Sequence, residues 1–510
     1  MDKQDRFNQI IAVLIAVVSL LAAVLAYLQS DAGGRDAQAN RDSIRYALEG
    51  FGTRVSGDAR VNFDYNVAYQ SLYEYQVLTN SAGNRDDAAA AARYETLSTE
   101  TSALSPMLAE PYYKMGEGSG PQVSRYEADV YLVKVTELFE KFTAATTVKE
   151  AWDYKSNTYI IHITLLAVAL FLFGLSVTIA SKFTRWIFSA SGVAFTLVAV
   201  IWAGNIFAQP VFDLRAQGNA ISNYASGVGL AHQDRYDEAI QAFDLALKDY
   251  PRYANAWLER GYANMALSNY ESAITDFKNA IDFGDSTANT AGQLAYAYHL
   301  TGQFDKAIDW DKQALTISPD ELWIQYDLGV NLLAAGKSDE AKAVYQKAMD
   351  QAASNVASVK ESGGEPPSYI WSAMEDGANS LDGLMYVIES GVGNPPKDKI
   401  SSPETVYTSA EELMKQLKSL SLALEYTGKV PQAGLSAEVT PFEFAEPVKD
   451  DKGEIINYNE PATSFANGLD EFVVRFDYTG MKDGSEVIFK LYINGEEDPS
   501  WRLVEPWSLG

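Results

Sequence analysis

Two short stretches of the chain contain residue types that could bind phosphate or attack a substrate. They are GKS at 336–338 and GDSTA at 284–288. A phosphate-binding loop would need a glycine where Asn331 stands and a strand before it. A nucleophile elbow would need a second glycine and a preceding strand, and 284–288 has neither. We therefore interpret 336–338 as a turn between two helices and predict no catalysis at either stretch.

Metal and thiol chemistry have few ligands available. The chain has no cysteine and only three histidines, which are scattered along it. Thiolate nucleophiles and zinc sites need cysteines or clustered histidines. We therefore predict that the protein is not an enzyme and has no metal site and no cofactor.

The charge of the chain is unevenly placed. Residues 213–510 hold 23 Lys and Arg against 47 Asp and Glu, a difference of −24 out of a total of −28. A segment this acidic is repelled by the phosphates of nucleic acid. We therefore predict no nucleic-acid partner.

One helical pattern recurs along the chain at a fixed interval. Four alanines are spaced by 34 residues, and each has a small residue twelve positions earlier and a further alanine seven positions later. The four alanines are Ala239, Ala273, Ala307 and Ala341, and the small residues are Gly227, Gly261, Ala295 and Gly329. Four positions after the alanines come Phe243, Phe277, Asp311 and Tyr345, so the third unit lacks the aromatic residue.

This pattern, over about residues 220–350, resembles the tetratricopeptide repeat, whose period is 34 residues. The resemblance implies about four units of two antiparallel helices each. One unit cannot bury its own apolar face, so the units stack into a solenoid. The third unit departs from the family pattern at Asp311, and the first has Asn223 in place of the early tryptophan.

The resemblance also implies a binding surface. In this family the first helix of each unit lines a concave groove that holds an extended peptide. The positions that correspond here are Asn255, Tyr262, Asn289, Tyr296, His299, Trp323 and Tyr326. Aromatic and amide side chains grip a peptide by stacking and hydrogen bonding. The alternative is that several of these rings only pack between helices. No Lys or Arg is among them, so the family's clamp for a terminal carboxylate is not expected.

Three uncharged apolar runs predict helices that cross a membrane. They are Phe7 to Ser30, Ser156 to Ser181 and Trp186 to Phe212. Each is long enough for the roughly 20 residues that span a bilayer. Short loops with Lys and Arg stay cytoplasmic, and these are the N-terminal tail and residues 182–185. We therefore predict a multi-pass protein of the bacterial cytoplasmic membrane, with the N-terminus cytoplasmic and the repeats and C-terminal module outside.

The remaining segments have weaker signals. Residues 31–155 predict a helical bundle, with breaks at GFGTRVSG (50–57) and at 111–121, and a helix is predicted from Tyr369 to Glu389. The C-terminal segment alternates with period two, and Asp483-Gly484 and Asn494-Gly495 are typical hairpin turns. We predict a small antiparallel, sandwich-like module. No closing strand follows Trp507, as in a module that is cut short.

The predicted fold class is therefore mainly α with a small β module. The predicted domains are 1–30 (membrane anchor), 31–155 (bundle), 156–212 (transmembrane hairpin), 213–350 (repeat solenoid), 351–434 (degenerate helical repeats or cap) and 435–510 (β module). The function that these features favour is a non-enzymatic scaffold for a protein or peptide partner at the cell envelope, anchored in the lipid bilayer. The alternatives are a sensor that uses residues 31–155 and a surface carbohydrate-binding protein that acts through the β module. The sequence leaves the partner and the oligomeric state open.

Overall fold

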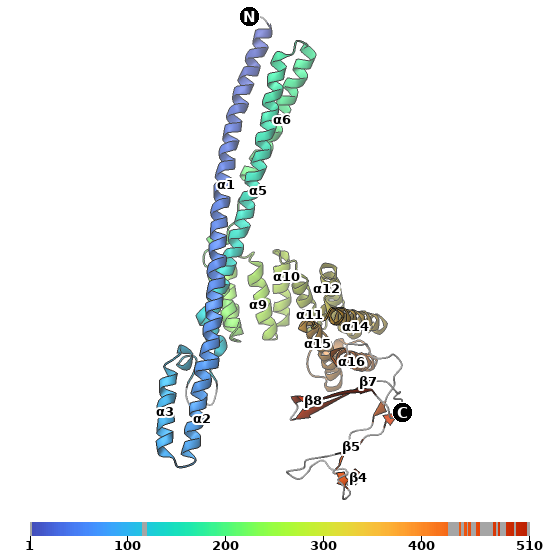
Figure 1. The fold of residues 1–510 in the computed structure, drawn as a ribbon. Coiled ribbons are helices and arrows are strands. Elements are labelled where there is room, and N and C mark those ends of the chain that lie inside the picture. The colour runs from blue at the N-terminus through green and yellow to red at the C-terminus, as the bar shows by residue number, and fades with distance from the viewer. Residues whose placement is uncertain are drawn as a thin grey trace. The chain divides into compact units, whose positions relative to one another are not determined.

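The computed structural model describes residues 3–114 and 120–426 and, between 438 and 506, eight short strands (Figure 1). The chain divides into two compact units, Met1–Ser286 and Thr287–Gly510.

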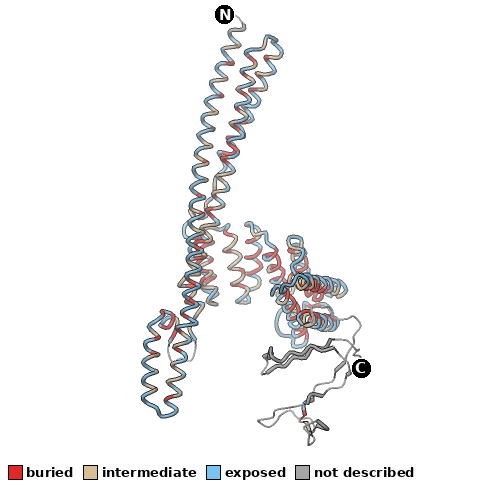
Figure 2. Tube along the Cα trace, in the orientation of Figure 1, coloured by how far each residue is buried: buried red, intermediate tan, exposed pale blue. Residues whose placement is uncertain are grey.

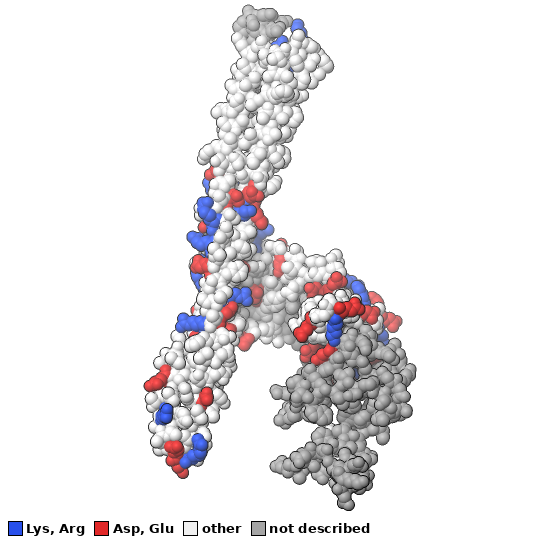
Figure 3. Space-filling model, in the orientation of Figure 1, with Lys and Arg blue, Asp and Glu red and all other residues white. Residues whose placement is uncertain are grey.

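Three long helices of the first unit pack side by side. They are α1 (Lys3–Phe63), α5 (Val133–Thr178) and α6 (Lys182–Ala208). All three are long and apolar enough to cross a membrane, and Figure 3 shows the stretch without charged side chains that they share. Apolar side chains also face outward there, such as Leu20 (68% exposed) and Ile201 (71% exposed). An apolar outer surface of this kind is what a helix in contact with lipid needs.

The segment 31–155, which lies between the first two apolar stretches, is mostly helical and begins with the second half of α1. A π-helical turn (Asp64–Tyr69) leads from α1 into α2 (Gln70–Gly83), and α3 (Ala88–Ser102) packs back against α2. The short α4 (Val123–Glu127) then leads through a second π-helical turn (Ala128–Leu132) into α5. The break predicted at 111–121 is confirmed for the described residues of that segment, since none of them is helical.

The break predicted at residues 50–57 is wrong, because α1 runs through it. Two of the three glycines there lie against neighbouring side chains, and only Gly57 is required for close packing. A Cβ on Gly50 would lie 3.6 Å from the Cβ of Leu138, and one on Gly57 would overlap the side chain of Tyr131. Glycine lowers helix propensity by only about 1 kcal/mol, and contact with α5 and the π-helical turn before it offsets this cost.

Two helix pairs complete the first unit. They are α7 (Ala220–Ala231) with α8 (Tyr236–Asp249) and α9 (Ala254–Ala266) with α10 (Tyr270–Asp282). The repeated alanines Ala239 and Ala273 are fully buried, and Figure 2 shows that buried residues recur along the paired helices. A Cβ on Gly261 would lie 2.6 Å from the Phe277 ring, so the small residue of each pair makes room for the aromatic one.

The second unit contains three further helix pairs. They are α11 (Ala288–Leu300) with α12 (Phe304–Ile317), α13 (Leu322–Ala334) with α14 (Ser338–Glu361), and α15 (Ser368–Ser390) with α16 (Pro403–Tyr426). The helix predicted from Tyr369 to Glu389 is α15. Gly336 and Lys337 of the stretch GKS lie in the turn between α13 and α14, as predicted, and Ser338 begins α14. Gly336 has a φ of +79°, which glycine adopts without strain.

The third repeat, α11 with α12, shows how the sequence compensates for its missing aromatic residue. Here Ala295 replaces the glycine, and Asp311 replaces the aromatic ring; both are fully buried. The extra methyl group on one helix is thus matched by a smaller side chain on the other. The cost is a buried carboxyl group that needs hydrogen-bond partners.

The described strands of the C-terminal segment pair two by two. The antiparallel ladders are β1 (Glu438–Val439) with β6 (Tyr478–Thr479), β2 (Glu443–Ala445) with β5 (Val473–Arg475), β3 (Pro447–Lys449) with β4 (Ile455–Tyr458), and β7 (Glu486–Ile493) with β8 (Glu496–Pro506). These four ladders give no support to the predicted sandwich. Ile493 pairs with Glu496, and both predicted turns and Trp507 lie outside the described residues.

Candidate functional site

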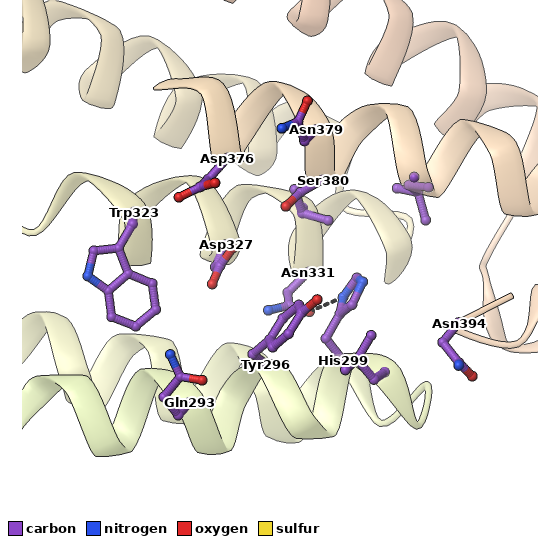
Figure 4. Close-up of a pocket in the computed structure, with 14 residues that line it drawn as sticks. Gln293, Tyr296, His299, Trp323, Asp327, Asn331, Asp376, Asn379, Ser380 and Asn394 are labelled. Carbon is purple, nitrogen blue, oxygen red and sulfur yellow. Dashed lines mark hydrogen bonds between the residues drawn. The ribbon is translucent and has the colours of Figure 1, made fainter. Parts of the chain in front are cut away.

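A pocket of about 510 Å³ lies in the second unit (Figure 4). Its walls come mainly from the first helix of each of three successive pairs. The lining residues are Gln293, Tyr296, His299 and Leu300 of α11, Trp323, Asp327, Val330 and Asn331 of α13, Asp376, Asn379, Ser380, Gly383 and Leu384 of α15, and Asn394. Within each helix these residues recur every three or four positions, in some places as adjacent pairs, so they share one face.

A hydrogen-bonded chain connects the pocket to the interior of the third repeat. Asn331 donates from Nδ2 to Oδ2 of Asp311 at 2.8 Å, and its Oδ1 lies 2.7 Å from Nδ1 of His299. Since the amide oxygen of Asn331 can only accept, Nδ1 of His299 is the donor. Burial lowers the pKa of His299 to about 4. The imidazole is therefore neutral at neutral pH, and its Nε2 is a hydrogen-bond acceptor.

Two carboxylates on neighbouring helices give the pocket its charge. Figure 4 shows Asp327 on α13 between Trp323 and Asn331, and Asp376 on α15. Burial, and after it the nearby charge of Asp376, raises the pKa of Asp327 to about 7. No Lys or Arg lines the pocket. The site therefore presents acceptors and aromatic faces, and it lacks a positive charge of its own.

Three of the seven predicted groove residues line this pocket: Tyr296, His299 and Trp323. The rings of Tyr296 and His299 are nearly parallel, with centroids 6.3 Å apart. Trp323 packs over Gly292 of α11, where a Cβ would overlap the edge of the indole. Asn289 is exposed on α11 but is not among the lining residues.

The prediction that Tyr326 lines the groove is wrong. It is fully buried and packs against Tyr345, with ring centroids 5.3 Å apart. Gly377 of α15 lies directly over it, since a Cβ there would be 2.8 Å from Cγ of the tyrosine. The next residue along α13, Asp327, is the one that lines the pocket.

The other two predicted residues belong to the first unit. Asn255 donates from Nδ2 to Oε1 of Glu140 on α5 at 2.9 Å, and Tyr253 donates its hydroxyl to Oε2 at 2.7 Å. Tyr262 packs edge-on against Phe277. The second repeat therefore uses a groove position to hold a helix of its own chain. Burial raises the pKa of Glu140, and these two hydrogen bonds oppose the rise.

The prediction missed the polar half of the pocket. Asp327 had a usable signal, because it stands 34 residues after Gln293 and 68 after Glu259, and all three are polar. Asp376 and Asn379 had none. They lie on α15, which is beyond the segment with the 34-residue period, so no repeat position identified them.

Replacing Asp327 with asparagine is expected to raise the thermal stability of the second unit at pH 8 by several degrees. The folded-state pKa of Asp327, about 7, is above its ordinary 3.8, so stability is lost as the pH rises between those values. His299 acts in the opposite direction, because its folded-state pKa, about 4, is below its ordinary value of 6.5. Its contribution to the stability of the folded state is therefore lost as the pH falls from 6.5 towards 4.

Thermal unfolding of the full chain in detergent at pH 5, 6.5 and 8 measures this balance. The variant is expected to lose stability below pH 6.5, because the opposing effect of Asp327 is gone. Asp376, Asp311 and Tyr345 are the other titratable groups around Asp327, and they are unchanged. The matched control is Asp382→Asn, an exposed position on α15. Identical pH profiles for wild type and Asp327→Asn would contradict the prediction.

A family model of the tetratricopeptide repeat matches residues 252–320 and 286–354, so this segment consists of tetratricopeptide repeats. A curated relative, the Small glutamine-rich tetratricopeptide repeat-containing protein 2 of Saccharomyces cerevisiae, is 29% identical over 108 residues. The match covers 21% of this chain and 29% of the relative. This chain therefore spans less than a third of the length of that protein.

Solved structures of repeat proteins are also similar to this chain. YrrB, described as a TPR protein with an unusual peptide-binding site, is 15% identical, with 41% of this chain and 94% of YrrB covered and a TM-score of 0.27. MamA from residue 41 to its end, from Desulfovibrio magneticus RS-1, is 18% identical, with 36% and 94% covered and a TM-score of 0.25.

Proposed function

We propose that this protein is a membrane-anchored scaffold without catalytic activity, and that its tetratricopeptide repeats hold a protein or peptide partner. The pocket on α11, α13 and α15 is the observation that carries the proposal. It lies on the first helices of successive pairs, the side on which repeats of this kind bind extended segments. Its aromatic and amide lining suits a peptide, and binding of this kind needs no cofactor.

The anchor and its orientation are part of the proposal. α1, α5 and α6 would cross the cytoplasmic membrane of a bacterium. The tail with Lys3 and Arg6 and the loop with Lys182 and Arg185 would lie inside, because short positively charged loops stay cytoplasmic. The repeats would then face outward, where the acidic segment 213–510 would meet envelope proteins rather than nucleic acid.

Cysteine labelling tests this orientation cleanly, because the natural chain has no cysteine. We expect Glu365→Cys, in an exposed loop of the second unit, to react with a membrane-impermeant maleimide in cells whose outer membrane is permeabilised. Lys182→Cys, exposed at the start of α6, should react only after lysis. The reverse pattern would place the repeats in the cytoplasm. Labelling of both positions before lysis would contradict the three-span anchor.

Site-specific crosslinking tests the scaffold itself. A photoreactive p-benzoylphenylalanine in place of Asn379, an exposed lining residue, is expected to give a discrete covalent adduct with a partner in cells. The control carries the same group in place of Asp382, which is exposed on the same helix but not in the lining. Equal adducts from both positions, or none from either, would contradict partner binding in the pocket.

A further inference from the structure

We infer that the pocket recognises a positively charged side chain, lysine or arginine, of a segment bound along α11, α13 and α15. This inference rests on the proposed function and specifies the chemistry of the partner. The acceptors that would receive the cation are the carboxylates of Asp327 and Asp376 and the Nε2 atom of His299.

The carboxylates of Asp327 and Asp376 have no counter-charge among the described residues of the helix pairs from α11 to α16. Among residues 287–426, none forms an ion pair or a hydrogen bond with Asp327 or Asp376. Because Asp327 is set back from water, its ionised form is costly without a cation beside it. A ligand ammonium or guanidinium would supply that missing charge and donate charge-assisted hydrogen bonds.

His299 is an independent observation that points to a donor on the ligand. Its side chain is only 8% exposed and lines the pocket. Nδ1 is committed to Asn331, and Nε2 has no partner among the described residues. This acceptor is not fully closed off from water, so a ligand donor can reach it, and the pocket offers no N–H from a lysine or arginine of its own. A bound guanidinium or ammonium carries donors that suit this position.

The walls and dimensions of the pocket favour an organic cation over a metal ion. Within the described part of the chain, no three His, Asp or Glu side chains are grouped closely enough to hold a metal. Trp323 and Tyr296 offer ring faces, on which arginine and lysine bind by cation–π contact. The volume of about 510 Å³ is that of a pocket for a large organic group, so a side chain with part of its backbone fits.

The experiment selects peptides from a random phage-displayed library against the full-length protein in lipid nanodiscs. We expect the selected peptides to share a lysine or arginine at one position. In synthetic versions, replacing that residue with norleucine or citrulline should weaken binding by about 10- to 100-fold, the range for loss of a charged hydrogen bond. Asp327→Asn should weaken it comparably, and Asp376→Asn, at an exposed position, by less.

A control variant and the folding of Asp327→Asn itself separate loss of recognition from loss of structure. Asp382→Asn removes the same charge from α15 outside the pocket and should leave affinity unchanged, and Asp327→Asn is expected to fold at least as well as wild type. Affinity should also rise between pH 6 and pH 8, as Asp327 ionises. Selected peptides without a required cation, or full affinity in Asp327→Asn, would overturn this inference and leave the proposed function standing. Selection of no peptide at all would overturn both.

Discussion

Replacing Gly329 with alanine is expected to lower the free energy of unfolding of the second unit by about 3 kcal/mol, the upper part of the range for overpacked cores. A Cβ at this position would overlap Cδ2 and Cε2 of the fully buried Tyr345. The ring cannot move aside easily. It packs against Tyr326, and its hydroxyl donates to the carbonyl oxygen of Gly377 at 3.3 Å.

Urea titration of the full chain in detergent, followed by hydrogen exchange of peptides from α13 and α14, measures this loss locally. The matched control is Gly383→Ala on α15, where an added Cβ meets nothing within 4 Å. This control should stabilise the protein by about 0.5–1 kcal/mol, because alanine favours helix. Combining Gly329→Ala with Tyr345→Leu should recover part of the loss. Equal effects at the two glycines would contradict the packing argument.

The substitution Asn331→Leu is expected to cost about 3 kcal/mol, because it leaves two buried polar groups without a partner. Asp311, fully buried, would lose its donor at 2.8 Å, and His299 would lose its acceptor at 2.7 Å. Leucine has the same branching of side-chain heavy atoms as asparagine but is the larger residue, so some overpacking adds to the cost at this buried position. The expected result is faster hydrogen exchange across α11, α12 and α13, the three helices that this chain of hydrogen bonds joins.

The control for this variant is Asn379→Leu, an exposed position on α15, which should change stability by no more than about 0.5 kcal/mol. A double variant tests the mechanism further. Asp311→Leu together with Asn331→Leu removes the buried carboxyl as well as its donor, so it should be more stable than Asn331→Leu alone. A loss below about 0.5 kcal/mol in the single variant would show that the hydrogen-bonded chain does not support the fold.

These two results bear on binding as well as on folding. Asn331 holds His299 in the tautomer that leaves Nε2 as an acceptor, and Gly329 lets α13 approach α14 closely. The pocket therefore depends on groups that hold its walls in place, beyond those that would bind a ligand's charge. For this reason, Asp327→Asn is the sharper probe of recognition, and changes at 329 and 331 are probes of the scaffold beneath it.

Several parts of the fold could be predicted from sequence because they depend on local pattern. Period and composition predicted the helix pairs, since small and aromatic residues sixteen positions apart must meet when two antiparallel helices pack. The uncharged runs predicted three apolar helices, because length and hydropathy decide that property without tertiary context. The turn at 336–338 followed from its glycine and from the absence of a preceding strand.

Other features depended on segments distant in sequence. The glycines at 50–57 were interpreted as a break, yet α1 continues through them because the segment leading into α5 packs against that face. Asn255 was assigned to a groove for partners, yet Glu140, 115 residues away, binds it. The sandwich was predicted from alternation alone, which cannot state which strands pair.

Tyr326 and Asp327 show most clearly which features follow from the sequence and which depend on the tertiary structure. The sequence by itself determined that a helix with an aromatic and acidic face would occupy 322–334, because the 34-residue period places it. Which of the two neighbours faces the pocket was decided only by the tertiary structure. Gly377 of α15 closes over the tyrosine and leaves the aspartate beside Asp376. Adjacent residues on a helix point about 100° apart, so the packing of α15, a helix without a clear repeat, decided which side chain is core and which is site.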